Sequence, residues 1–173
     1  FIVQSGLDVE KLQDLAGLTF TFGSESSTSG HLMPRHFLIQ AGIDPEFDFR
    51  GLANFSGSHD KTWALVEAGA FQAGVLNEAI WDKAVDEGRV DISKVREFFV
   101  TPAFFDYNWT ARGDLDQEFG DGFATKVRTA ILSLDGDNQD VLDLFSTDSF
   151  IASKNDNYQT IQYVAEALGI IRN

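Results

Sequence analysis

The chain has 173 residues, of which 43% are hydrophobic, and it carries a formal net charge of −14 with no cysteine. The missing cysteines exclude disulfides, thiolate chemistry and Cys-ligated metal sites, and the acidic balance argues against nucleic acid or anionic membranes as partners. The length suits one domain or two small lobes, and the apolar runs fall far short of the roughly 20 residues that span a bilayer.

The first residues resemble the end of a strand, because Phe1, Ile2 and Val3 form an apolar run. There is no initiator methionine and no signal peptide in the sequence, so we expect a longer protein with its leader upstream. Residues 7–16 show a short helical pattern, and Gly17 is placed to end it.

The most informative stretch runs from residue 18 to 41, where an apolar segment, 18–22, leads through a Ser/Thr/Gly loop into a helical pattern. The first turn of a helix presents unpaired backbone N–H groups and a partial positive charge, and hydroxyl side chains add donors. This pattern predicts an anion site; the alternative is an ordinary helix N-cap. A nucleotide-type P-loop is excluded, because His31 follows Gly30 where that motif requires a lysine.

Further along, strand-like and helix-like segments alternate, with turn residues at each junction, which favours an open α/β sheet. The expected strands are 18–22, 49–55, 71–77 and 95–101, and the expected helices between them are 30–41, 59–68 and 78–86. If these strands are parallel, the loops 23–30, 56–60 and 76–78 lie at one edge of the sheet, where such folds bind ligands. Three more helices are expected over 116–134, 137–145 and 155–168.

The segment FGSESSTSGHLMPRHFL (22–38) resembles the S-S-T-S-G segment of phosphonate-binding proteins, the extracytoplasmic components of phosphonate and phosphite ABC importers. Two more segments resemble this family, HDKTWALVEAGAFQAGVLNEAIWDK (59–83) and PAFFDYNWTARGDL (102–115), so that the resemblance begins near Leu12 and covers most of the chain. It implies a periplasmic-binding-protein-like α/β fold with an open sheet and helices on both faces, of which most of the first lobe is missing.

The resemblance also implies a division of the chain. Residues 1–17 are expected to be a connector and remnant of the first lobe, and 18–105 the second lobe with the anion site. Residues 106–173 are expected to be a return segment and helices that pack on the first lobe. Without that lobe, the helices would expose an apolar face and favour self-association.

For the site, the resemblance implies that Ser27, Thr28 and Ser29 bind phosphonate oxygens and that His59 donates a hydrogen bond to the ligand. Asp106 matches an acidic ligand residue of the family, and Glu78 is a second candidate acid. Either acid could accept the proton of a P–OH group or pair with an ammonium. Their ordinary alternatives are a turn residue for Asp106 and a first-turn acid for Glu78.

The leading hypothesis is therefore a binding module and not an enzyme. It is periplasmic, or extracytoplasmic and membrane-anchored, binds a phosphonate, phosphite or phosphate-like anion between two lobes, and docks on an ABC permease. No cofactor or metal is expected, and His31 and His36 lack the i, i+4 spacing of a helical metal pair. Two alternatives remain at this stage: the sensing domain of a membrane receptor, and a hydrolase with the triad types Ser29, His59 and Asp106.

Overall fold

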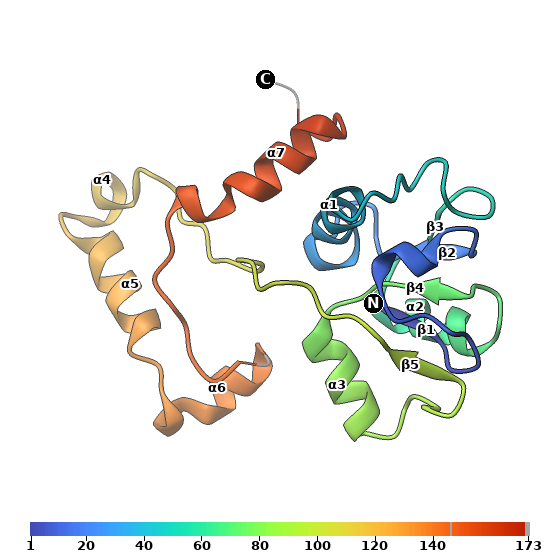
Figure 1. Cartoon of the computed structure of the whole chain (residues 1–173). Coiled ribbons are helices and arrows are strands. Elements are labelled where there is room, and N and C mark those ends of the chain that lie inside the picture. The colour runs from blue at the N-terminus through green and yellow to red at the C-terminus, as the bar shows by residue number, and fades with distance from the viewer. Residues whose placement is uncertain (146, 172–173) are drawn as a thin grey trace. The chain divides into compact units, whose positions relative to one another are not determined.

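The computed structural model describes residues 1–145 and 147–171, and the chain divides into two compact units (Figure 1). Unit 1 comprises Phe1–Asp106 together with the residues from 159 onward, and unit 2 comprises Tyr107–Tyr158. Unit 1 holds the sheet and every residue that the sequence singles out as a candidate ligand.

The sheet of unit 1 joins five strands, within the described residues, in the order β3-β2-β4-β1-β5. The strands are β1 (Ile2–Gln4), β2 (Phe20–Phe22), β3 (Asn54–Phe55), β4 (Ala73–Gly74) and β5 (Val95–Glu97). Strand β2 runs parallel to both β3 and β4, whereas β1 is antiparallel to β4 and β5. The three loops that follow β2, β3 and β4 therefore leave the sheet at one edge, as the sequence predicted.

Helical segments follow these strands in the expected alternation. In unit 1 they are the 3₁₀ segment η1 (Leu12–Leu15), the π-helical segment η2 (Thr28–Leu32), α1 (Met33–Gln40), α2 (His59–Glu67), α3 (Glu78–Asp86) and α7 (Gln159–Ala167). The segment η2 passes directly into α1, with Pro34 in the first turn of α1, and the carbonyl of Gly30 accepts instead from the N–H of Gly23. This arrangement confirms the mixed α/β class, with an open sheet flanked by helices.

The core lies on both faces of the sheet, as the period of two in a strand requires. Val3 belongs to a cluster that contains Phe20 and Phe22 and reaches Leu38 of α1. Its neighbour Ile2 belongs to the second cluster, whose members come largely from α2 and α3: Trp63, Val66, Leu76, Trp81, Ala84, Val90 and Val95. The two faces of the sheet are thus covered by different helices, with α1 on one face and α2 and α3 on the other.

The first strand, β1, is an inner strand of the sheet in unit 1. Ile2 pairs with Gly74 on one side and with Glu97 on the other, so β1 lies inside the sheet of unit 1. Residues 1–17 therefore belong to the same compact unit as the residues that follow. Its two faces are buried by the two core clusters, since Val3 belongs to the first and Ile2 to the second, and Ile2 and Val3 are 1% and 0% exposed.

Unit 2 is helical over much of its length, with α4 (Leu115–Phe119), α5 (Phe123–Leu132), η3 (Gly136–Asn138), α6 (Gln139–Leu144) and η4 (Asn155–Tyr158). The single helix expected over 116–134 is interrupted at Gly120 and Gly122, which both adopt positive φ. The carboxylate of Asp116 accepts a hydrogen bond from the Ala124 N–H at 2.7 Å and so satisfies the start of α5.

Exposed apolar side chains are frequent in unit 2. Phe119 is 55% exposed, Leu144 80% and Ile151 70%. Their burial on a first lobe or on a second chain stays a prediction.

The last helix, α7, belongs to unit 1. Val164 and Ala165 bury against Leu32 at the end of η2, with Ile161 and Leu168 packed around them. The helix α7 thus packs on η2, the helical segment that includes Thr28 and Ser29. Among the described residues, no helix combines the length and apolarity needed to cross a membrane.

Candidate functional site

The Ser/Thr loop between β2 and η2 is closed by two glycines. The N–H of Gly23 donates to the carbonyl of Gly30 at 2.8 Å. A Cβ on Gly23 would lie 3.2 Å from Gly30 Cα, and a Cβ on Gly30 would lie 2.9 Å from Ser27 Oγ and 3.3 Å from His59 Cε1. Glycine at 30 therefore permits the close approach of this loop to Gly23 and to the His59 ring.

Ser27 begins the helical segment as its N-cap. Its Oγ accepts a hydrogen bond from the Gly30 N–H at 2.9 Å, and its hydrogen remains available to a ligand. Ser27 and Thr28 are half-buried, whereas Ser29 is 7% exposed. Within the described residues, the Thr28 hydroxyl has no hydrogen-bond partner. The loop thus offers hydroxyl donors at the start of a continuous helical segment, where backbone N–H groups are also unpaired.

The second loop contributes His59, the first residue of α2. The backbone N–H of Asn77 donates to His59 Nδ1 at 3.2 Å. Because a backbone N–H cannot accept, Nδ1 must carry the lone pair, and in the neutral ring the proton lies on Nε2. Burial lowers the pKa of His59, and the opposing charges of Asp106 and Asp60 do not reverse this. His59 is therefore a neutral Nε2–H donor near pH 7.

The third loop and the return segment meet at Ser29. The side-chain amide of Asn77 donates to Ser29 Oγ at 3.4 Å, and both side chains lie beside the carboxylate of Asp106, whose pKa they act to lower. Burial raises the pKa of Asp106, while the hydrogen bonds from Ser29 and Asn77 and the proximity of His59 oppose that shift. Ser29, His59, Asn77 and Asp106 thus form one polar cluster at the edge of the sheet.

A cavity of ≈ 260 Å³ opens beside this cluster. Its polar lining includes Ser29, Asn77 and Asp106, and apolar groups such as Trp81 and Phe104 complete its wall. Glu78 also lines the cavity, as the exposed first residue of α3. The structure therefore places Glu78 next to the cluster, whereas the hydrogen bonds within the cluster come from the other residues.

The sequence did not single out Asn77. Its Oδ1 accepts from the Ile80 N–H at 3.2 Å and caps α3, which is the ordinary role of asparagine before a helix. The same side chain turns its amide nitrogen toward Ser29. A polar residue at the end of the third parallel strand was the available signal, because that position must face the other two loops.

The cluster does not have the geometry of a hydrolase triad. Among the described residues, no hydrogen bond joins Ser29 Oγ to His59. The Nδ1 lone pair of His59 is engaged by the Asn77 N–H, and its Nε2 carries the proton, so neither nitrogen can accept the Ser29 proton in this arrangement. Ser29 instead interacts with Asn77 and Asp106.

The other two histidines lie outside the cluster. His31 is 5% exposed and packs edge-on against Phe22 and Phe55, and His36 contacts the ring of Phe37. Across the described part of the chain, no group of three or more His, Asp or Glu side chains is arranged to hold a metal ion.

Neutral donors at helix starts, with one carboxylate, thus gather at the carboxyl edge of an α/β sheet, which is the edge where such folds bind ligands. The family model for the periplasmic phosphonate substrate-binding protein of ABC transporters matches residues 1–158. The chain belongs to this family of ABC-transporter phosphonate-binding proteins.

Individual relatives agree with the family. A probable ABC transporter phosphite-binding protein, PhnD1 of Prochlorococcus marinus (strain MIT 9301), is 40% identical over 182 residues, covering 99% of this chain and 61% of that protein. The structure of PhnD1 from the same organism in complex with methylphosphonate is similar, with a TM-score of 0.85 over 98% of this chain and 66% of that one.

A more distant neighbour shows the same fold. It is a binding-protein component of a phosphonate ABC transporter from Pseudomonas aeruginosa, with a TM-score of 0.67 at 18% identity, and the alignment covers 94% of this chain and 54% of that one. The chain thus spans less than two thirds of the length of these relatives.

Proposed function

We propose that this chain supplies the anion-binding lobe of a periplasmic or extracytoplasmic solute-binding protein, which delivers a phosphonate, phosphite or phosphate-like oxyanion to an ABC permease. The observation that carries the proposal is the convergence of Ser29, His59 and Asp106 from three separate segments. Family membership and the 40% identity to a probable phosphite-binding protein support it. Binding and release, without covalent chemistry, complete the proposed cycle.

The hydroxyls of Ser27 and Thr28 bind the oxygens of the ligand through hydrogens that have no partner among the described residues of the unliganded chain. The Ser29 hydroxyl also binds the ligand, after its hydrogen turns away from Asp106. The Nε2–H of His59 provides a further donor. The hydrogen bond from the Asn77 N–H to Nδ1 holds the ring in the tautomer that carries this proton. Hydrogen bonds to a charged group contribute about 1.5–3 kcal/mol each, so several donors together offset the cost of desolvating the anion.

Asp106 has a different role in this proposal. A carboxylate repels a fully ionised phosphonate, but it accepts a hydrogen bond from the P–OH of a monoprotonated one. When the Ser29 hydroxyl turns toward the ligand, the Asp106 carboxylate is left to accept the hydrogen bond from the P–OH group. The arrangement favours the monoanion over the dianion, or a ligand that carries an ammonium group, for which Glu78 is a second acid beside the cavity.

The net charge of −14 does not conflict with an anionic ligand. Surface charges beyond roughly 8–10 Å are screened at physiological ionic strength, whereas the donors of the loop lie in contact with the ligand. The local arrangement of hydroxyl and N–H groups therefore decides binding.

The test is isothermal titration of the full-length protein with 2-aminoethylphosphonate, methylphosphonate, phosphite and phosphate. We expect submicromolar binding of at least one ligand, and the ranking identifies what Asp106 and Glu78 recognise. Ser27→Ala and Thr28→Ala should each weaken binding by about 1–3 kcal/mol.

The matched control for these variants is Ser26→Ala, since Ser26 is an exposed hydroxyl of the same loop. It should bind as the unmodified protein does. Failure of all four ligands to bind, or unchanged affinity in both the Ser27 and Thr28 variants, would contradict the proposed site.

A further inference from the structure

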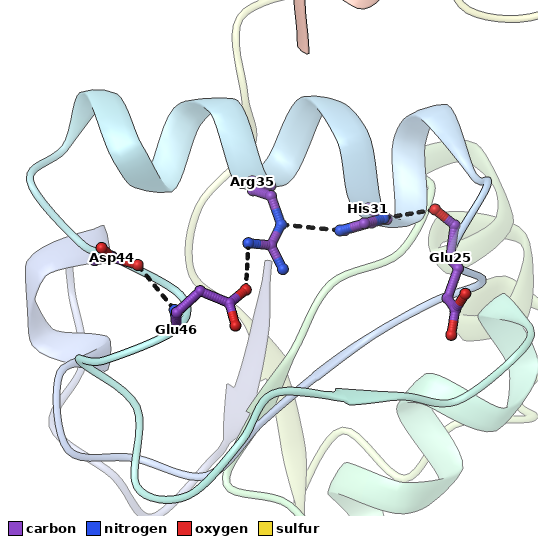
Figure 2. A network of polar contacts seen from close by, with 5 residues as sticks. All are labelled: Glu25, His31, Arg35, Asp44 and Glu46. Carbon is purple, nitrogen blue, oxygen red and sulfur yellow. Dashed lines mark hydrogen bonds and ion pairs between the residues drawn. The ribbon is translucent and has the colours of Figure 1, made fainter. Parts of the chain in front are cut away.

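A buried arginine lies behind the Ser/Thr loop, outside the candidate site. Arg35 of α1 is 7% exposed, and its guanidinium carbon lies 5.2 Å from the centroid of the Phe22 ring. Burying a cation is costly unless its donors are satisfied. Figure 2 shows how two partners satisfy it: the Nε–H donates to His31 Nε2 at 2.9 Å, and Nη1 pairs with Glu46 at 2.8 Å.

The contact with Arg35 and a second contact on the other ring nitrogen together determine where His31 holds its proton. A guanidinium has donors only, so Nε2 of His31 must be the acceptor. In the neutral ring the proton then lies on Nδ1, which donates to the backbone carbonyl of Glu25 at 2.6 Å (Figure 2). Burial lowers the pKa of His31, and the charge of Arg35 acts in the same direction; the hydrogen bond to the Glu25 carbonyl and the charges of Glu25 and Glu46 oppose them.

The chain of contacts thus runs from the turn after α1 to the loop before η2. Glu46 is itself tied to that turn, because its N–H donates to Asp44 at 2.9 Å. At the other end, the Glu25 carbonyl lies two residues before Ser27, whose Oγ and carbonyl cap the helical segment. These contacts, Glu46–Arg35–His31–Glu25, form a relay. The relay connects α1 to the part of the loop that precedes the candidate hydroxyls.

An apolar side chain would fill the space over Phe22 at lower cost, since replacing buried ionic groups by hydrophobic ones is often neutral or stabilising. Arginine differs in having separate N–H groups that reach two partners in fixed directions. Arg35 uses both kinds of contact, because Nη1 binds Glu46 and the Nε–H binds His31.

We propose that Arg35 and His31 are positioning residues, which hold the Glu25–Ser29 part of the loop in its ligand-binding conformation without contacting the ligand. This inference rests on the proposed oxyanion site. Its two structural consequences, a fixed Nδ1–H tautomer of His31 and a protected loop backbone, exist in the unliganded protein and can be measured whether or not a phosphonate binds.

The test compares Arg35→Met and Arg35→Lys in the full-length protein. Methionine fills the space without a donor. Lysine keeps a cation for Glu46 but lacks the second fixed N–H for His31. The control is Leu38→Val, a change at a fully buried position of the same helix that lies outside the relay. The readouts are amide hydrogen exchange over residues 25–32, the ¹⁵N shifts of the His31 ring, and titration with methylphosphonate.

We expect both Arg35 variants to lose the Nδ1–H signature of His31 and to exchange the loop amides about tenfold faster, the effect of one charge-assisted hydrogen bond. Methylphosphonate affinity should fall by a similar factor. Leu38→Val should lower global stability without changing the tautomer. If Arg35→Met does not fold, Arg35→Lys carries the test.

The inference is overturned if both the tautomer and the loop exchange stay as in the unmodified protein, or if Leu38→Val reproduces the changes. If the tautomer and exchange change as expected while no protein binds methylphosphonate, the positioning of the loop holds and the proposed oxyanion function fails instead.

Discussion

The backbone N–H of Asn77 donates to Nδ1 of His59, and this single contact places the proton of the neutral ring on Nε2. Because the donor belongs to the backbone at the end of a strand, no side-chain exchange at 77 other than proline removes it. The opposite tautomer is held at His31, where the donor is Arg35. The buried His31 and the half-buried His59 therefore hold opposite tautomers within unit 1.

The first prediction separates the two nitrogens of His59. Glutamine places an amide donor near the position of Nε2, whereas asparagine places an acceptor near that of Nδ1 and has no donor of comparable reach. We expect His59→Asn to lose about 1.5–3 kcal/mol of methylphosphonate binding, the contribution of one hydrogen bond to a charged group, and His59→Gln to retain more. Calorimetric titration of both variants measures the difference.

The control for His59 is His36→Gln, which changes a histidine that lies outside the cluster. It should bind normally. Equal affinities of the Asn and Gln variants of His59 would show that Nε2 donates nothing to the ligand.

The second prediction concerns the amide of Asn77. Aspartate at this position still caps α3, since it is as good an N-cap as asparagine. It loses the Nδ2–H donors to Ser29 and Asp106 and places a like charge beside Asp106, which raises the pKa of Asp106 further. We expect Asn77→Asp to weaken methylphosphonate binding at least tenfold with the helix content unchanged, as measured by calorimetry and circular dichroism.

Asn77→Ser is the matched variant, because serine also caps the helix and adds no charge. Its loss of affinity should be smaller than that of Asn77→Asp. If the aspartate variant binds as well as the unmodified protein, the amide of Asn77 has no part in the site.

The sequence predicted that the three loops leave the sheet at one edge, because a general rule of parallel sheets applied. Loops after successive parallel strands must leave at one edge, so Ser29 and His59 could be placed together from their positions alone. Asp106 could not be placed by that rule, and only the family resemblance linked it to the cluster. Asn77 was missed because a capping asparagine and a site asparagine have the same sequence pattern, and only the direction of its Nδ2 distinguishes them.

Two features of the fold were beyond sequence reasoning for a different reason. Strand β1 spans three residues, and its pairing with Gly74 and Glu97 joins parts of the chain that no local pattern connects. The alternation over 49–55 predicted a long strand, but β3 is Asn54–Phe55. Phe49 owes its burial to stacking on Phe20, with ring centroids 4.6 Å apart, and not to pairing in the sheet.

The third prediction tests the close approach of two loops at Gly30. An added methyl group would lie 2.9 Å from Ser27 Oγ and 3.3 Å from His59 Cε1. We expect Gly30→Ala to displace the Ser27 cap, at a cost of about 1 kcal/mol in stability. It should also weaken methylphosphonate binding more than tenfold, because the added methyl group displaces both Ser27 and His59. Thermal unfolding and titration measure the two effects.

Gly6→Ala is the control, since a Cβ at Gly6 meets nothing within 4 Å. It should leave both stability and affinity close to those of the unmodified protein. Normal binding by Gly30→Ala would mean that the spacing between Ser27 and His59 is not needed for the ligand.

The last prediction concerns Asp106, where function and stability oppose each other. Burial raises the pKa of its carboxyl group in the folded protein above the ordinary value, despite the hydrogen bonds from Ser29 and Asn77. A raised pKa means that the folded state holds the proton more tightly than the unfolded state. The resulting contribution to stability is therefore present in acid and is lost as the pH rises through the folded-state pKa. At pH 7 the ionised carboxylate is a cost to the unliganded protein.

We therefore expect Asp106→Asn to raise the unfolding temperature of the unliganded protein at pH 7 and to bind methylphosphonate more weakly. The stabilisation should shrink as the pH falls through the raised pKa of Asp106, where Asp106 itself becomes protonated. In the unmodified protein, affinity should fall as the pH rises through the second ionisation of the ligand, because the dianion has no P–OH for the carboxylate to accept. Calorimetric unfolding and titration between pH 4 and 9 measure these trends. An Asp106→Asn protein that is less stable at pH 7, or an affinity that rises as the ligand becomes a dianion, would show that Asp106 is a structural acceptor and does not recognise the ligand proton.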